Sequence, residues 1–301
     1  MVEKPHDDEK SGLKLQLNNI LLRAMKALSG YYNDNIEDEK ATELARFREA
    51  YNFRAPEIFA MARYKTIKNS LETPENLPIK KEIQKLRLFI LSEMSTVVSN
   101  FVPEKITWLR SLVVSFLTLW NARRGEEGSR ITLAEWSDAI NGKWVPPDQV
   151  KAIEDEAEKA LVGKFKLAYL HGKGRKFVPC LIPINTIEAV GLLVENRAAF
   201  GVHPDNPFVF ATKGGKGHAS GWHSLNQVAT KADVKINATA NRHFVSTVYA
   251  GLEMNPNEEQ VFLDHMGHTK PINKENYQCP QRVKECDGQN TSEHKFRYTT
   301  K

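Results

Sequence analysis

The chain has 301 residues, of which 41% are hydrophobic and 26% charged, so it is long enough for one large or two ordinary globular domains. Its net charge of +5 is uneven, because residues 1–76 hold 12 Lys and Arg against 13 Asp and Glu, whereas residues 77–301 hold 30 against 24. Three cysteines do not make a disulfide framework, and we find no signal peptide and no apolar run long enough to span a bilayer. We therefore expect an intracellular protein in a reducing compartment.

The first part of the chain is predicted to be helical. Three segments have apolar residues at helical spacing: 13–28, 37–51 and 56–70. The third is expected to open at Pro56. The stretch LETPENLP, residues 71–78, indicates an extended linker because of its two prolines. We place a domain boundary there, giving a helical domain at 1–76 and a second domain at 77–301 with a polar tail from about 281.

The second part is predicted to be mainly helical with one hairpin. Residues 165–182 alternate on both sides of a turn that contains glycine, which predicts a β-hairpin. Asn185 and Glu188 are expected to cap the helix that follows, and loops are expected at 144–149 and 211–222. Helices are predicted from residue 79, at about 105–122, 186–200, 223–232, about 241–252, and 257–266. The predicted fold class is therefore mainly α with a small β-hairpin.

Positively charged side chains lie at the ends of several predicted elements. They are Arg123 and Arg124 after a helix, Lys173 at the hairpin tip, Arg242 and His243 at a helix start, and His268 nine residues before Tyr277. An arginine offers a rigid pair of donors that fits two phosphate oxygens. A tyrosine hydroxyl is a poor nucleophile near neutral pH, and cations around a phosphate would stabilise the extra negative charge of a transition state. Taken singly, each of these motifs is more typical of a charged surface turn or a packed core residue.

Together and in this order, the motifs resemble those of the tyrosine recombinase (phage integrase) superfamily over residues 77–280. They are Arg124-Gly-Glu-Glu127, GKGRKFVP with Lys173, TANRHFVST with Arg242, and Gly267-His268 with Tyr277 nine residues on. The resemblance implies a helical core-binding domain that clamps DNA, followed by a catalytic domain. The spelling of these motifs is closer to recombinase-like genes of eukaryotic mobile elements such as Cryptons, which implies a nuclear location if the source is eukaryotic.

The resemblance also implies a mechanism. Tyr277 would attack a DNA phosphodiester and form a 3′-phosphotyrosyl link, while Arg124 and Arg242 hold the non-bridging oxygens. His268 would donate a further hydrogen bond, and Lys173 would protonate the leaving 5′-oxygen. The strand would be resealed without ATP, metal or another cofactor. The implied partners are double-stranded DNA and further copies of the chain, as a tetramer on paired sites, with no membrane and no nucleotide.

One departure from the family pattern concerns Thr239, which stands where that family usually has His or Lys. A threonine hydroxyl can bind a phosphate oxygen but cannot act as a base near neutral pH. His243 and His265 lie near it in sequence and could compensate. The departure leaves open a second hypothesis, a catalytically silent DNA-binding protein descended from such an enzyme. Contacts to DNA phosphates are predicted for Lys164, Lys166, Arg175, Lys176, Lys213, Lys216 and His218.

Two other classes remain open. A type IB topoisomerase would use the same chemistry without pairing two sites. A zinc site could draw on four residues, His265, His268, Cys279 and Cys286, although the spacing of the two cysteines is wider than in usual structural sites. The glycine- and lysine-rich loops do not form a phosphate-binding loop of the nucleotide-binding type, because no Lys-Ser or Lys-Thr follows the required glycine frame.

Overall fold

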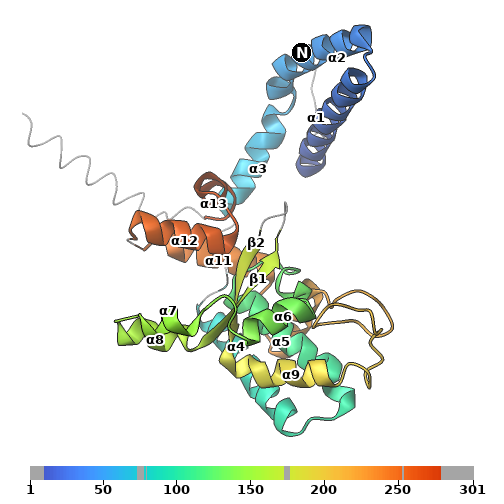
Figure 1. Ribbon diagram of the computed structural model, residues 1–301. Helices are drawn as coiled ribbons and strands as arrows, with labels where there is room; N and C mark the ends of the chain where they lie inside the picture. The colour runs from blue at the N-terminus through green and yellow to red at the C-terminus, as the bar shows by residue number, and fades with distance from the viewer. Residues whose placement is uncertain (1–9, 73–77, 79, 173–176, 253, 279–301) are drawn as a thin grey trace, which may run out of the picture. The chain divides into compact units, whose positions relative to one another are not determined.

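The computed structural model describes residues 10–72, 78, 80–172, 177–252 and 254–278 (Figure 1). The chain divides into two compact units, Met1–Glu75 and Asn76–Lys301. Within the described residues the fold is mainly helical with a single two-stranded antiparallel sheet, which confirms the predicted fold class. In those same ranges, no helix has both the length and the apolar composition that a membrane span requires.

The first unit consists of α1 (Ser11–Asp34), α2 (Asp38–Ile58) and α3 (Ala60–Glu72). Helix α1 packs against both of the others, and the Tyr51 hydroxyl donates a hydrogen bond to Asn18 Oδ1 at 2.7 Å. The helix expected to open at Pro56 does not, because this proline lies in the last turn of α2. The α2 hydrogen bonding continues past Pro56, since the Phe59 N–H still bonds to the Ala55 carbonyl, and the break falls at Phe59.

The second unit is built around α5, which is apolar on nearly all sides. Ten of the residues of α5 are buried, and the helix packs against α4, α9 and α10. The helices of this unit are α4 (Lys80–Ser99), α5 (Ile106–Trp120), α6 (Leu133–Ile140), α7 (Pro147–Lys151), α8 (Glu156–Val162), α9 (Ile187–Glu195), α10 (Gly221–Lys231), α11 (Ala238–Ala250), α12 (Pro256–Met266) and α13 (Lys270–Asn276). Short 3-10 turns occur at Pro103–Lys105, Gly128–Arg130 and Ile184–Thr186.

The predicted hairpin is present as β1 (Phe165–His171) paired with β2 (Phe177–Pro183). Its inward face carries small and aliphatic side chains, such as Ala168 and Cys180, which join the core cluster around α5. Asn121, just after α5, pairs with β2 through its side chain, since Nδ2 donates to the Leu181 carbonyl (2.9 Å) and Oδ1 accepts from the Leu181 N–H (2.8 Å). This pair fixes the hairpin beside the turn that carries Arg123 and Arg124.

Several local predictions are wrong. Asn185 and Glu188 do not cap α9, because Thr186 occupies the N-cap position and donates its own hydroxyl to the Pro183 carbonyl (2.7 Å). Helix α9 also ends at Glu195 rather than Phe200. Helix α6 was not predicted, although Thr132 and Glu135 form a reciprocal capping box at its start.

The two expected loops are shorter than predicted. The first becomes helical at Pro147, where α7 begins, because proline is well suited to the first helical position. The second ends at Gly221, where α10 begins behind the Ser220 cap. The remaining loop residues are held by the Asn206 side chain, whose Nδ2 donates to the carbonyls of Gly215 and Gly217 at 2.8 Å each.

Candidate functional site

The turn after α5 presents two adjacent arginines to one carboxylate. Ala122 adopts a positive φ of 48°, which reverses the chain directly before Arg123. Arg123 is fully buried, donates to the Pro179 carbonyl on β2, and lies 3.7 Å from Glu127 Oε2. Arg124 is partly exposed and donates from Nη1 to Glu127 Oε1 at 3.1 Å. Glu127 therefore holds both guanidinium groups near the end of α5.

The pKa values of these arginines differ because their exposures differ. Burial lowers the pKa of Arg123, and the Glu127 carboxylate opposes that shift. Burial also acts to lower the pKa of Arg124, but Glu127, with a smaller contribution from Tyr277, outweighs it and the pKa is raised. Arg124 is therefore the firmly charged and accessible member of the pair.

Arg242, near the start of α11, points inward to backbone carbonyls. It is 2% exposed, its Nη1 donates to the Ala122 carbonyl at 3.1 Å, and its Nη2 donates to the Met266 carbonyl at 2.5 Å. The same Nη2 contacts His268 Nε2. Burial lowers the pKa of the Arg242 guanidinium. Arg242 thus joins the end of α5, the end of α12 and the histidine that follows.

His268 reaches Arg242 because α12 ends in a left-handed residue. Gly267 has φ 67°, and an added Cβ there would lie 3.3 Å from Val178 Cγ1, so both the conformation and the space favour glycine. Burial lowers the pKa of His268 to about 4, and the charge of Arg242 adds to that shift. The ring is therefore neutral near pH 7, and because arginine only donates, His268 Nε2 is the acceptor of this contact.

Tyr277 follows α13 directly and lies against both of these residues. Its ring is stacked on His268, with centroids 4.1 Å apart and an interplanar angle of 17°, and the Arg242 guanidinium lies 4.8 Å from the ring centroid. His243 Nδ1 lies 3.1 Å from the Tyr277 carbonyl oxygen. Four residues that the sequence singled out, Arg124, Arg242, His268 and Tyr277, thus belong to one site.

A cavity of ≈ 560 Å³ opens on this site. It is lined by Arg124, Gly125, Glu126, Glu127, Arg130, His171, Trp222, Ala238, Thr239, Arg242 and Tyr277. Two donors of Arg123 (Nε and Nη1) and one of Arg242 (Nε) are buried without a hydrogen-bond partner among the described residues. Arg123 does not line the cavity and lies against Glu127. Arg242 does line it, so its unpaired donor, together with Arg124 and Arg130, favours an anion as ligand.

Three lining residues with polar or aromatic side chains were not predicted from the sequence: Arg130, His171 and Trp222. They come from a 3-10 turn, a strand end and the first turn of α10, and none belongs to a motif that could have marked it. The Arg130 Nε donates to His218 Nε2 at 3.3 Å, and His218 Nδ1 in turn lies 2.9 Å from the Ala219 carbonyl oxygen. His218, predicted to contact DNA, therefore supports an arginine at the edge of the cavity.

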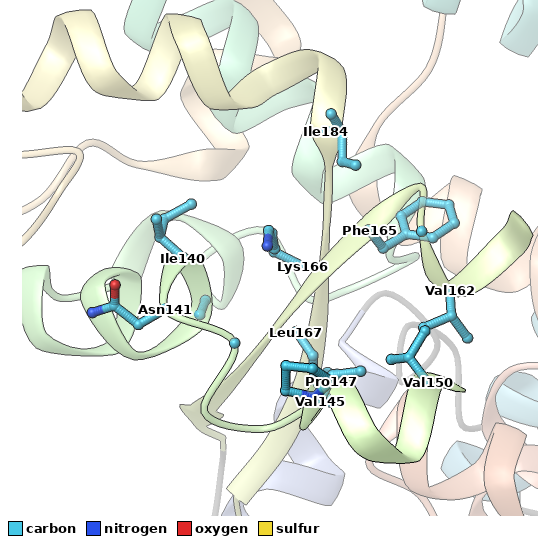
Figure 2. Close-up of a pocket in the computed structure, with 13 residues that line it drawn as sticks. Ile140, Asn141, Val145, Pro147, Val150, Val162, Phe165, Lys166, Leu167 and Ile184 are labelled. Atoms are coloured by element: carbon cyan, nitrogen blue, oxygen red, sulfur yellow. The ribbon is translucent and has the colours of Figure 1, made fainter. Parts of the chain in front are cut away.

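Among the described residues, none of those predicted to contact DNA lines this cavity itself. Lys164 and Lys213 are exposed, and Lys216 lies 3.4 Å from Asp205 Oδ2. Lys166 lines a separate cavity of ≈ 380 Å³, where aliphatic side chains from α6, α7, α8 and β1 meet (Figure 2). Lys173, Arg175 and Lys176 lie outside the described residues, so their predicted roles stay predictions.

Of the four residues considered for a zinc site, the two histidines lie within the described residues and have different partners. His265 Nε2 lies 3.0 Å from the Asn121 carbonyl oxygen, and His268 contacts Arg242. Cys279 and Cys286 lie outside the described residues. Over the ranges that are described, no three His, Cys, Asp or Glu side chains gather as a metal site would require.

No protein-family model matches this chain, and no curated protein matches its sequence. Solved structures with a similar fold include the XerH site-specific recombinase bound to its difH substrate in a pre-cleavage complex, with TM-score 0.44 and 12% identity over 69% of this chain and 50% of that one. A XerH post-cleavage complex on a palindromic difH substrate gives TM-score 0.44 and 13% identity over 70% and 53% of the two chains. XerA recombinase gives TM-score 0.41 and 11% identity over 70% and 62%. The chain thus spans about half the length of the XerH chains.

Proposed function

We propose that this chain is a DNA strand-transferase of the tyrosine recombinase kind, acting as a site-specific recombinase or integrase. The observation that carries the proposal is the position of Tyr277, on the same cavity as Arg124 and Arg242 and stacked on His268 at 4.1 Å. A phenol beside guanidinium groups suits in-line attack on a phosphodiester, because the cations stabilise the charge that develops on the non-bridging oxygens.

In this proposal the Tyr277 oxygen forms a bond to phosphorus, the bond from phosphorus to the 5′-oxygen breaks, and a 3′-phosphotyrosyl link results. Arg124 contacts the phosphate directly, since its side chain is 35% exposed and its charge is maintained by Glu127. Arg242 holds the surrounding backbone in place, because its Nη1 and Nη2 donate to the carbonyls of Ala122 and Met266. Proton donation to the 5′-oxygen is the predicted role of Lys173.

A covalent adduct tests this proposal. A nicked double-stranded suicide substrate traps the phosphotyrosyl link, and we expect the wild type to form an adduct that Tyr277→Phe abolishes. Tyr249→Phe is the matched control, because Tyr249 stacks on Phe262 and does not line the cavity. Arg124→Ala is expected to reduce the adduct rate by about 10²-fold or more. Absence of an adduct in the wild type across several substrates would contradict catalysis.

A second candidate is a silent DNA-binding protein, and the observation that favours it is the exposed Thr239 on the cavity wall. It predicts binding to duplex DNA that weakens steeply with salt but gives no adduct. Adduct formation by the wild type separates the two candidates. If the wild type is silent, a gain of adduct in Thr239→His identifies Thr239 as the cause, and unchanged silence supports a binding role. Assembly as a tetramer on paired sites, a mobile-element origin and a nuclear location stay predictions from the sequence.

A further inference from the structure

Asn273 lies at the junction of three parts of the site. It is 1% exposed on α13, and its backbone carbonyl accepts hydrogen bonds from the N–H groups of Tyr277 and Gln278, each at 3.0 Å. Its side-chain Oδ1 accepts from the Ser246 hydroxyl of α11 at 3.1 Å and lies 3.4 Å from His268 Nδ1. One buried residue thus contacts the segment of Tyr277 through its backbone carbonyl, and α11 and His268 through its side-chain amide.

The chemistry of Arg242 fixes which amide atom faces the histidine. A guanidinium has donors and no acceptor, so His268 Nε2, which contacts Arg242 Nη2, must be the unprotonated nitrogen of a neutral ring. The proton of the neutral ring is then on Nδ1, and Nδ1–H needs an acceptor. The amide oxygen of Asn273 is that acceptor. If the amide were rotated by half a turn, its NH₂ group would face the Nδ1–H of His268, and two donors would meet.

We propose that Asn273 is a positioning residue that holds His268 in the Nδ1–H tautomer and ties the segment carrying Tyr277 to the helix carrying Arg242. The catalytic consequence rests on the proposed function. In the free protein His268 is an acceptor for Arg242, and it can donate to a phosphate oxygen only after Nε2 gains a proton and Arg242 turns away. Asn273 therefore selects the neutral tautomer in which Nε2 is an acceptor, whereas burial and the charge of Arg242 oppose the doubly protonated donor form.

The surroundings of His268 oppose protonation. Burial is the largest cause of its lowered pKa, followed by the charge of Arg242 on α11, whereas the hydrogen bond to Asn273 acts in the opposite direction. Arg124 and Arg123, from the turn after α5, add smaller contributions of the same sign as Arg242. Tyr277 closes the remaining side by ring stacking. A carboxylate in place of the Asn273 amide would face Nδ1–H and favour the imidazolium.

Nuclear magnetic resonance of the full chain labelled with ¹⁵N-histidine tests the assignment without DNA. We expect the Nδ1–H tautomer for His268 in the wild type and in Ser246→Ala, which removes the hydroxyl but leaves the amide in place. Asn273→Asp is expected to raise the pKa of His268 from about 4 by about one unit or more. His265 is the internal control, because its pKa is also lowered to about 4 by burial, yet its partner is the Asn121 carbonyl.

Two results would overturn the proposal. One is an Nε2–H tautomer in the wild type, and the other is an unmoved His268 pKa in folded Asn273→Asp. The catalytic consequence is tested in the adduct assay. Asn273→Asp keeps Tyr277 and should move the pH dependence of the adduct rate to higher pH, and an unshifted pH dependence overturns that consequence. Failure of the proposed function is distinguishable, because it leaves the wild type without an adduct whatever the histidine spectrum shows.

Discussion

Gly221→Ala should disturb the candidate site from a distance, through backbone contact alone. Gly221 begins α10, and its Cα faces the backbone of Gly125, the residue after Arg124. An alanine Cβ at this position would lie 2.7 Å from the Gly125 carbonyl carbon and closer still to its oxygen. Thr118 Oγ1 lies 3.5 Å from the same point, so α10 has little room to shift toward α5.

The size of the effect follows from that overlap. Nonbonded carbon atoms rest about 3.5–4.0 Å apart, so the carbonyl carbon alone requires the two backbones to separate by about 1 Å, and the nearer oxygen requires more. Overpacking of this kind costs about 1–3 kcal/mol, which lowers the melting temperature by about 2–4 °C for each kcal/mol in a unit of this size. Because Arg124 is bonded to Gly125, it moves too, and a displacement of about 1 Å can reduce a reaction rate by about 10²-fold.

Urea unfolding and the adduct assay measure the two effects separately. Gly191→Ala is the matched control, because that glycine lies inside α9 with no atom within 4 Å of an added Cβ. The control should be neutral or stabilised by up to about 1 kcal/mol, since alanine favours helix over glycine. If Gly221→Ala unfolds at the wild-type midpoint and forms adduct at the wild-type rate, the close contact between α10 and the arginine turn is not as described.

Three further predictions concern buried groups of the second unit. Arg242→Ala should lower the free energy of unfolding by about 2–4 kcal/mol because it leaves buried carbonyls without a donor, whereas Arg130→Ala, exposed on the same cavity, should change it by about 0.5 kcal/mol or less in urea titrations. Burial lowers the pKa of His265 to about 4 in the folded protein, against an ordinary 6.5, so as the pH drops below 6.5 protons bind the unfolded state first and the free energy of unfolding falls. His265→Gln should reduce this dependence of the free energy of unfolding on pH by up to about 1.4 kcal/mol per pH unit between about pH 6.5 and 5. Burial raises the pKa of Cys180 to about 12, so iodoacetamide should label this thiol only after guanidinium unfolding, and mass spectrometry of its peptide reports the labelling.

Long periodic segments of the fold were predictable from the sequence, and short ones were not. The apolar surface of α5 and the alternation in β1 and β2 are strong signals because many side chains repeat them. Helix α6 has only eight residues and α13 seven, too few to display a period. At Pro56 a local rule failed, because the preference of proline for helix starts was outweighed by the continuing hydrogen bonds of α2.

The candidate site was predictable in four of its members but not in their orientations. Spacing and motif order singled out Arg124, Arg242, His268 and Tyr277, and these residues share one site in the structure. Nothing in the sequence predicted that Arg242 would face backbone carbonyls, since that depends on where α5 and α12 end in space. Asn273 was missed for a related reason, because its contact with Ser246 of α11 arises only when α13 is folded back.

The two arginines that resemble a matched pair in sequence therefore do different work. The carbonyls that Arg242 binds come from Ala122, just beyond α5, and from Met266 in the last turn of α12, where helix ends leave oxygens without intrahelical partners. Such carbonyls carry the negative end of the helix dipole, so they stabilise a buried guanidinium that no carboxylate of the described residues contacts directly. Arg124 has a carboxylate partner and solvent access instead. Under the proposed function, an incoming phosphate would meet Arg124 first. It would have to compete with the two backbone oxygens and with His268 for the donors of Arg242, so the strength of those internal contacts would limit what Arg242 contributes to phosphate binding.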